Sequence, residues 1–229
     1  MSFHSLHGVT GGLMADSDDS HAMRRRIQKG ALPLFLKNGY SNTTTDDIAR
    51  ALGMSKKTLY QSYSGKRALF EDVVDAMLST LKAEFDTIDH DTAAGPIEKI
   101  KRTFHLVGSR ISLLGPLLVS DMFRSLPDVW EKIDTFRKGV IFGRLRSHLT
   151  AAQKQGLIRQ DIDDGLLTTI HFLLLPQMIT PHTLSQIPYS PGTVLEAIVN
   201  IIYSGALTGK GREQFGTLAV EQTDWEGVL

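Results

Sequence analysis

Apolar side chains recur every three to four residues along most of this chain, and this period constrains its fold more than any other feature. Three segments show the stripe most clearly: Ile27, Ala31, Leu34 and Phe35; Leu69, Val73, Met77 and Leu81; and Ile100, Phe104, Val107 and Ile111. No stretch of useful length shows the alternation of apolar and polar residues that a strand requires. The sequence therefore predicts an all-α protein.

Glycine and proline residues divide this pattern into separate helices. They predict a fourth helix from Lys66 to about Asp86, a long helix from Pro127 through Gln155, a Pro-rich loop from Pro181 to Pro191, and two last helices at about 163–179 and 192–207. The first 20 residues lack the basic start and apolar run of a signal peptide, and we expect them to be disordered. The predicted organisation is a tail at 1–20, a small domain at 21–70, a larger helical domain at 71–209 and a C-terminal tail at 210–229.

The formal net charge of zero hides an uneven distribution of charge along the chain. Residues 21–70 hold ten basic residues and two aspartates, a net charge of +8, whereas residues 71–229 carry −5 and residues 1–20 carry −3. A compact basic segment is typical of nucleic-acid binding, although a run of charge is as often only a solvated face. The motif inside the segment has to decide between these alternatives.

The composition excludes several classes of protein. With no cysteine, the chain has no disulfide, no Cys-ligated zinc and no thiolate nucleophile. The motifs HExxH, GxSxG, GxGxxG and the Walker loop are absent, the eight histidines show no metal-ligand spacing, and Asp161–Gly165 lacks the spacing of a calcium loop. The longest apolar stretches are far shorter than the roughly 20 residues of a membrane span. We therefore expect a cytoplasmic protein that is not an enzyme and has no cofactor or metal.

Two short helices joined by a tight turn are predicted inside the basic segment. Thr43 or Thr44 caps the first helix, Gly53 makes the turn and Ser55 caps the second helix, which ends at Tyr63. The positions that matter most for comparison with known families are Ala31, Leu34, Phe35, Gly39, Tyr40, Thr43, Thr44, Ile48, Ala49, Gly53, Ser55, Thr58, Leu59, Tyr60, Tyr63, Lys66 and Leu69. At these positions residues 30–69 resemble the helix-turn-helix domain of the TetR family of transcriptional regulators.

The resemblance implies a role for each exposed side chain of the motif. In the family, the second short helix enters the major groove of DNA while the first lies across the backbone. The residues expected to contact phosphates are Thr44, Thr58, Tyr60 and Lys66, and those expected to face the bases are Lys56, Lys57, Gln61 and Ser62. Tyr60 could instead only pack, and either of the two adjacent lysines could bind phosphate. The family often has a small residue at the position of Lys57, which leaves the depth of the helix in the groove open.

The last two predicted helices are apolar on more than one face. In the helix at 192–207 two neighbouring stripes are apolar, and the segment from Leu166 to Leu175 is apolar nearly all round. A monomer of this size would struggle to bury both helices. The resemblance implies that they pair across a two-fold axis into the four-helix bundle of a homodimer, whereas a helix pair buried within one subunit is the alternative.

These features predict an N-terminal three-helix DNA-binding domain and a C-terminal helical bundle for dimerisation and ligand binding. We expect a repressor that leaves a palindromic operator when an apolar or aromatic small molecule fills the C-terminal domain. The candidate wall residues are Phe104, His105, Met122, Phe123, Phe136 and His171, each of which could also be simple core. The alternative is a regulator controlled by a protein partner or by abundance, with a filled core, and a cavity would discriminate between the two.

Overall fold

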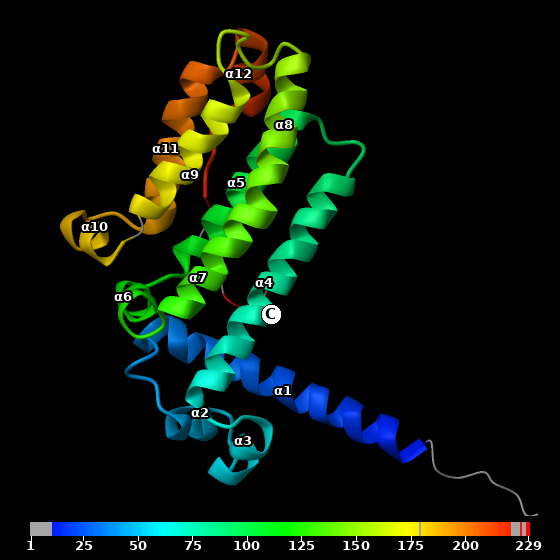
Figure 1. The fold of residues 1–229 in the computed structure, drawn as a ribbon, viewed down its shortest axis with the longest axis vertical. Helices are drawn as coiled ribbons and strands as arrows, with labels where there is room; N and C mark the ends of the chain where they lie inside the picture. Colours follow the sequence, from blue (N-terminus) through cyan, green and yellow to red (C-terminus); the bar gives the residue numbers. More distant parts are fainter. Residues whose placement is uncertain (1–10, 179, 221–224, 226–227) are drawn as a thin grey trace, which may run out of the picture.

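The structure, a computed structural model, describes residues 11–178, 180–220, 225 and 228–229, and this part of the chain consists of helices joined by short loops (Figure 1). The elements in chain order are α1 (Gly11–Asn38), α2 (Thr45–Ala51), α3 (Lys56–Ser62), α4 (Lys66–His90), α5 (Pro96–Ser112), α6 (Pro116–Arg124), α7 (Pro127–Phe136), the π-helical turn η1 (Arg137–Ile141), α8 (Phe142–Lys154), α9 (Asp164–Met178), α10 (Pro181–Gln186), α11 (Pro191–Ala206) and α12 (Gly209–Phe215). No strand occurs among these described residues, where the only β pairing is an isolated bridge between Ile158 and Leu207. The predicted all-α fold is confirmed.

The helices are arranged in two regions that α4 connects. In Figure 1, α1, α2 and α3 lie at the lower end, and α5, α8, α9 and α11 form a bundle that rises above them. The first half of α4 packs against α1, and the whole helix continues upward beside the bundle. The domain boundary predicted between residues 70 and 71 therefore falls inside one continuous helix.

Local capping fixes the two short helices of the helix-turn-helix. The Thr44 hydroxyl accepts a hydrogen bond from the backbone N–H of Asp47 at 3.1 Å, and the Asp47 carboxylate accepts one from the backbone N–H of Thr44 at 3.0 Å. Gly53 has a φ of 61°, a left-handed conformation that allows the sharp turn. Ser55 then caps α3 by accepting the N–H of Thr58 at 3.1 Å. The cap at Thr44, the turn and the cap at Ser55 are as predicted.

An apolar core beneath α1 holds α2 and α3 in place. Ile48, Leu59 and Tyr63 are buried in this core, which also includes side chains of α4, α6 and α7 and which we call the N-terminal core. A Cβ atom on Gly30 would lie 2.2 Å from Cδ2 of Leu52, so a larger residue here would force the Leu52 side chain at the end of α2 to move. Because one face of α3 is buried here, the opposite face is turned to solvent.

A second apolar core, the distal core, lies between α5, α8, α9 and α11. Its fully buried or nearly fully buried members include Ile100, Phe104, Leu145, Leu149, Leu195, Val199 and Tyr203. Each of these helices contributes one apolar stripe at helical spacing, as the sequence pattern predicts for the bundle. The second apolar stripe of α9 and of α11 therefore does not face this core.

A π-helical turn interrupts the long helix predicted from Pro127 through Gln155. α7, η1 and α8 follow one another without a loop, so helix is present over almost all of the predicted range. Single π turns inside α-helices are rare and are frequent at functional sites. The apolar periodicity gave no sign of this turn, since a single wider turn shifts the register by only one residue.

The chain ends and the Pro-rich loop differ from the sequence predictions. α1 begins at Gly11, so residues 11–20 are helical and not disordered as expected, and they contain no proline that would end the helix. Residues 1–10 lie outside the described residues. Residues 210–229 are not simply a tail, because α12 includes residues 209–215, and Leu218 and Val228 are buried. The loop at 181–191 contains α10, which Thr180 caps.

Candidate functional site

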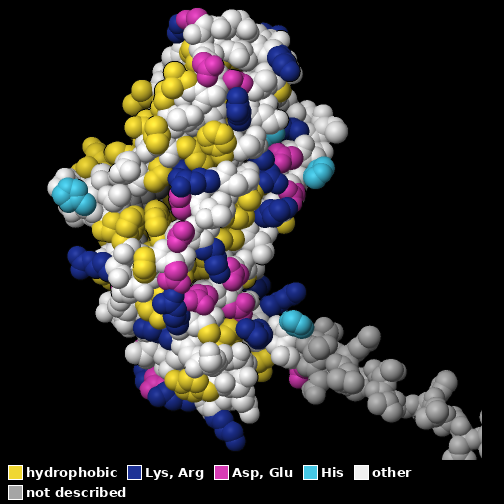
Figure 2. Space-filling view, in the orientation of Figure 1, with side chains coloured by type: hydrophobic (Ala, Val, Ile, Leu, Met, Phe, Trp, Pro, Cys, Tyr) yellow, Lys and Arg dark blue, Asp and Glu magenta, His cyan; other side chains and the backbone are white. Residues whose placement is uncertain are grey.

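The outer side of α3 presents four long side chains at the lower end of the molecule. Lys56, Lys57, Tyr60 and Gln61 are exposed, whereas Leu59 between them is fully buried. We call these four exposed residues the α3 face, and basic side chains are seen to project from this end of the molecule in Figure 2. The eight residues predicted to contact DNA all lie on α2, α3, their caps or the first turn of α4: Thr44, Lys56, Lys57, Thr58, Tyr60, Gln61, Ser62 and Lys66.

The two lysines of the α3 face differ in their partners. Nζ of Lys56 lies 2.5 Å from the carboxylate of Asp46 on α2, whereas Lys57 has no ion-pair partner among the described residues. Arg50 on α2 lies 3.6 Å from the carboxylate of Asp47. Such exposed pairs contribute little to stability. The charge of the α3 face is thus least neutralised at Lys57, close to the start of the helix.

The hydroxyl groups predicted to contact phosphates already take part in local hydrogen bonds. The Thr44 hydroxyl lies 2.5 Å from the Asp47 carboxylate, and the Thr58 hydroxyl lies 2.8 Å from that of Ser55. The hydrogen bond that the Asp47 carboxylate accepts from the Thr44 hydroxyl is the main cause that holds the pKa of Asp47 below its usual range. Tyr60 is about half exposed, at 49%. These groups lie beside the α3 face, and their contact with phosphate stays a prediction.

Lys66, the first residue of α4, connects that helix to the loop before α2. Its Nζ donates to the carbonyl oxygens of Tyr40 at 2.8 Å and Ser41 at 3.4 Å, and it lies 4.2 Å from the centre of the Tyr40 ring. Burial lowers the pKa of Lys66. An ammonium group has three donors, so one remains for a further acceptor. Lys66 therefore fixes the position of the helix-turn-helix relative to α4, and its phosphate contact also stays a prediction.

An apolar cavity of about 170 Å³ lies where α1 meets α4, α5, α6 and α7. Helix α4 contributes the largest share of its wall, through Phe70, Val73, Val74, Met77, Leu78 and Leu81, and α1 contributes Leu32, Phe35 and Leu36. In another protein an engineered apolar cavity of about 150 Å³ binds benzene. This cavity is therefore large enough for a small apolar molecule, which would contact both α1 and α4.

Two arginines in the wall of this cavity are paired with neighbouring groups. Nη2 of Arg110 donates to both carboxylate oxygens of Glu84, at 2.6 and 2.7 Å. Arg137 of η1 donates to the carboxylate of Asp134 at 2.6 Å and to the carbonyl oxygen of Phe172 at 3.1 Å. Each guanidinium charge is thus offset by a carboxylate that does not itself line the cavity.

Four of the six predicted ligand residues line one of two adjacent cavities. Met122 and Phe136 line the larger cavity, and Phe104 and His171 line a smaller one of about 50 Å³ in the distal core. Three residues line both cavities: Val107, Arg137 and Ile141. Two of these, Arg137 and Ile141, are the first and last residues of η1. The π turn therefore forms part of the partition between the cavities.

His105 and Phe123 do not line either cavity. His105 borders an open groove on the surface, and Phe123 is 36% exposed with its ring 4.5 Å from that of Trp130. Packing turns these positions outward, which helical spacing alone did not reveal. The wall residues of α4 were not predicted from the sequence, although two adjacent apolar stripes on that helix, one through Val73 and one through Val74, indicate that it is covered on more than one side.

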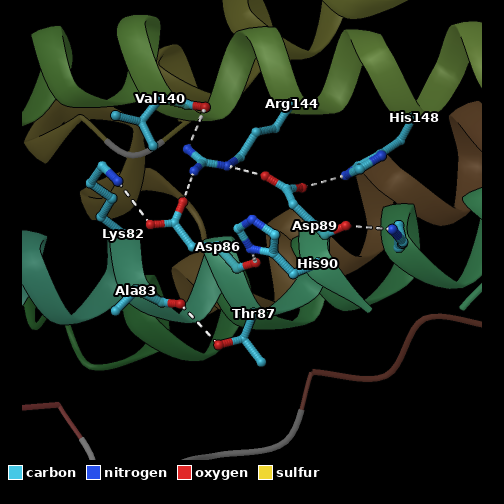
Figure 3. Close-up of polar contacts among 10 residues, drawn as sticks. Lys82, Ala83, Asp86, Thr87, Asp89, His90, Val140, Arg144 and His148 are labelled. Carbon is cyan, nitrogen blue, oxygen red and sulfur yellow. Dashed lines mark hydrogen bonds and ion pairs between the residues drawn. The ribbon is translucent and has the colours of Figure 1, made fainter. Parts of the chain in front are cut away.

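Polar contacts fasten the second half of α4 to α8 (Figure 3). Nε of Arg144 donates to Asp89 at 2.6 Å, its Nη2 donates to Asp86, and Nε2 of His148 lies 3.0 Å from Asp89. Lys82 binds Asp86 from the exposed side at 2.8 Å, and this bond is the main cause that holds the pKa of Asp86 below its usual range. Helix α4 is thus fixed to α8 above the cavity and to the helix-turn-helix below it.

An apolar surface is exposed along α9 and α11. Its large side chains are Leu166, Ile170, Leu173 and Leu174 of α9 and Ile201 of α11, which are between 36% and 71% exposed. The four α9 residues follow the helical spacing of three and four, so they share one side of that helix. Yellow side chains gather along the upper left edge of Figure 2, where α9 and α11 lie in Figure 1. We call these five residues the α9–α11 surface.

Neither a metal site nor a single membrane-spanning helix is found in the described ranges. No three side chains of the types that bind metals are arranged around a common point there. No helix of that part of the chain is long and apolar enough by itself to cross a membrane, and α5 and α6 pass such a test only as a pair bent by 87°.

The N-terminal part of the chain matches a family model. Residues 27–73 match the model described as bacterial regulatory proteins of the tetR family. This range begins inside α1 and ends in the third turn of α4, so it contains the whole α3 face and Lys66. The match therefore falls on the segment that the sequence pattern singled out.

Relatives and solved structures extend the likeness to most of the chain. The HTH-type transcriptional regulator YvaF of Bacillus subtilis (strain 168) is 28% identical over 80% of this chain and 95% of its own length. The HTH-type transcriptional repressor DhaR of Mycobacterium sp. (strain GP1) is 25% identical over 63% of this chain and 74% of its own. The transcriptional regulator FadR of Bacillus subtilis, solved in complex with stearoyl-CoA, has a TM-score of 0.55 at 19% identity and covers 79% of this chain and 98% of its own.

Proposed function

Since the chain belongs to the TetR family of transcriptional regulators, we propose that it is a repressor that binds a palindromic operator and is released by a small molecule. The observation that carries the proposal is the outward α3 face, a short capped helix with basic and amide side chains on its exposed side. DhaR, which is named as a repressor, supports repression as the output. The relatives described above are named as regulators, so we propose no catalytic activity, and we infer that the protein acts in the cytoplasm.

The proposed DNA contacts follow from the partners of each side chain. Lys57 and Gln61 are exposed and have no partner among the described residues, so they are free to reach base edges in the major groove. Lys56 can do so once its pair with Asp46 opens. We assign phosphate contacts to Thr44, Thr58, Tyr60 and Lys66, and a base-facing position to Ser62 at the end of the helix. Phosphate contacts orient the protein, whereas base contacts give specificity.

TetR-family regulators dimerise, and we propose that this chain does so through the α9–α11 surface. Exposed leucine and isoleucine side chains at helical spacing are typical of a helix face that packs against another helix. Pairing α9 and α11 with their copies would make a four-helix bundle about a two-fold axis. The two copies of α3 would then lie about one DNA turn apart, roughly 34 to 36 Å, as reading a palindrome requires.

The effector is proposed to bind in the larger cavity. Its wall includes α1, which carries the helix-turn-helix, and α4, which connects the two regions, so an occupant would bear directly on both. The alternative hypothesis, control by a protein partner or by abundance, expects a filled core, and the cavity favours a ligand instead. FadR binds stearoyl-CoA, which supports small-molecule control in proteins of this fold.

A selection from random DNA duplexes tests the proposed function. The full chain is expected to enrich an inverted repeat, and its affinity for that repeat should exceed its affinity for unrelated duplex at least about 1,000-fold. A Gln61→Ala, Lys57→Glu double variant, changed only on the α3 face, is expected to lose this preference. If no sequence is enriched, or if the variant enriches the same repeat, the proposal is wrong.

A further inference from the structure

His171 of α9 is fully buried, and one of its ring nitrogens lacks a partner. Nδ1 lies 2.7 Å from the carbonyl oxygen of Leu167, which can only accept, so Nδ1 carries a proton. Burial lowers the pKa of His171, which leaves Nε2 as an acceptor with a free lone pair. Nε2 has no hydrogen-bond partner among the described residues. A buried acceptor without a donor is unfavourable, so this nitrogen is suited to receive a donor from a bound molecule.

The position of His171 connects this acceptor to the proposed effector site. His171 lines the smaller cavity, which shares Val107, Arg137 and Ile141 with the larger one. A ligand whose body fills the larger cavity can therefore extend one polar group toward His171 when a side chain of η1 rotates. The rings of Phe104 and Tyr203 lie with their centres 5.2 and 5.5 Å from that of His171, and the buried hydroxyl of Tyr203 also has no hydrogen-bond partner among the described residues.

The charges around the two cavities argue against an anionic ligand. Arg137 and Arg110 are the charged side chains in their walls, and each is bonded to a carboxylate, Asp134 and Glu84 respectively. Because both guanidinium groups are already paired, an anion entering here would have to compete with a carboxylate for them and would lose its hydration. A neutral donor bound to Nε2 of His171 has no such penalty.

We propose that the effector is a neutral, mostly apolar molecule the size of one substituted ring, with a hydroxyl group that donates a hydrogen bond to Nε2 of His171. The volumes of about 170 and 50 Å³ set this size, since about 150 Å³ accommodates benzene in another protein. A substituted phenol or a small alicyclic alcohol has this chemistry. The assignment rests on the proposed function in taking the cavity as the effector site.

Calorimetric titration of the full chain without DNA tests the hydroxyl requirement with two isomers. 4-Propylphenol has a hydroxyl donor, whereas 4-ethylanisole has the same atoms but no donor. The phenol is expected to bind about fivefold to tenfold more tightly, as one buried hydrogen bond provides. 4-Ethylbenzoate at pH 7.5 is expected to bind at least tenfold more weakly than the phenol. Equal binding of the isomers, tighter binding of the benzoate, or no binding by any of them overturns the proposal.

A His171→Leu variant tests the residue itself. It is expected to bind the two isomers equally, with its affinity for 4-ethylanisole within about twofold of the original, whereas His105→Leu, changed at the surface groove, keeps the full preference. His171→Phe serves if the leucine variant does not fold, as judged by its helical circular dichroism. If the His171 variant still binds the phenol more tightly than its isomer, the assignment is wrong. Because the titration needs no DNA, its failure leaves the proposed DNA binding untouched, and a failure to bind DNA leaves the titration interpretable.

Discussion

At the scale of single residues, specificity is expected to depend on the two long side chains of the α3 face that have no partner. Gln61 and Lys57 are exposed without hydrogen-bond or ion-pair partners among the described residues, whereas Lys56 is held by Asp46. An amide at this place can form two hydrogen bonds to an adenine, and a lysine can donate to a guanine. Discrimination between bases should therefore depend more on Gln61 and Lys57 than on Lys56.

A Gln61→Ala substitution is expected to reduce the preference for one base pair of each half-site. The loss should be about 1–3 kcal/mol of discrimination, with little change in binding to unrelated duplex. Fluorescence anisotropy on the selected duplex and on its single-base variants measures this difference. Gln186→Ala, on the exposed side of α10, is the matched control. Equal losses on every duplex would instead assign Gln61 to the phosphate backbone.

The buried His171 is expected to make stability fall in mild acid. Burial lowers its folded-state pKa below the ordinary value of 6.5, so the unfolded chain takes up a proton first as the pH falls. The contribution of His171 to the free energy of unfolding is present above pH 6.5 and is lost below it. For one proton the loss is no more than about 1.4 kcal/mol per pH unit. Burial lowers the pKa of His148 as well, which adds to the effect in spite of the opposing charge of Asp89.

Urea unfolding at pH 7.5 and 5.5 measures this dependence. The decrease in the free energy of unfolding between the two pH values should be smaller in His171→Leu than in the original chain. His182→Leu, changed at an exposed position of α10, serves as the control and should keep the original decrease. An unchanged decrease in the His171 variant would mean that burial does not lower the pKa of this histidine in the folded protein.

At the scale of elements, α4 is expected to transmit the effect of a ligand because it is fixed at both ends. Lys66 bonds its first turn to the loop before α2, and Arg144 and His148 bond its last turns to α8. The cavity lies between these two attachments. Occupation of the cavity can therefore tilt α4 only by moving the helix-turn-helix or by stretching the contacts with α8.

Arg144→Ala is expected to release the upper attachment. Asp86 and Asp89 would lose a partner that is only 18% exposed, so the variant should be less stable than the original, and ligand binding should change DNA affinity less than before. Lys82→Ala removes the exposed partner of the same Asp86 and should lower stability less. Urea unfolding and anisotropy with and without 4-propylphenol make the comparison. If the ligand changes the DNA affinity of Arg144→Ala as much as that of the original chain, α4 does not need this attachment to transmit the effect of the ligand.

The elements that could be predicted from the sequence are those fixed by local chemistry. The caps at Thr44 and Ser55 and the turn at Gly53 are set by neighbouring residues, and their predicted places are confirmed. The π turn, α12 and the start of α1 depend on tertiary packing or on the absence of a stop signal, which helical periodicity does not report. For the same reason the wall residues Met122 and Phe136 could not be told in advance from Phe123, which faces solvent.

At the scale of the whole molecule, binding of both half-sites of a palindrome requires a dimer, which we propose forms through the α9–α11 surface. Leu173, a member of this surface, is 66% exposed, and Leu173→Glu would place a charge between paired helices. The variant is expected to sediment as a monomer and to lose about 100-fold or more in affinity for the inverted repeat, because the two half-sites are then bound separately. Leu117→Glu, at a 52% exposed position of α6 outside this surface, should remain dimeric. A dimeric Leu173→Glu would place the interface elsewhere.

Protection of the selected duplex from dimethyl sulfate measures whether α3 enters the major groove. The reagent methylates N7 of guanine, which lies in the major groove. Bound protein is expected to protect guanines in two half-sites whose centres are about 10 base pairs, one helical turn, or a multiple of that apart, and the Gln61→Ala, Lys57→Glu double variant should leave them reactive. If the wild-type protein binds the duplex while every guanine N7 stays reactive, α3 is not in the groove and the account is wrong.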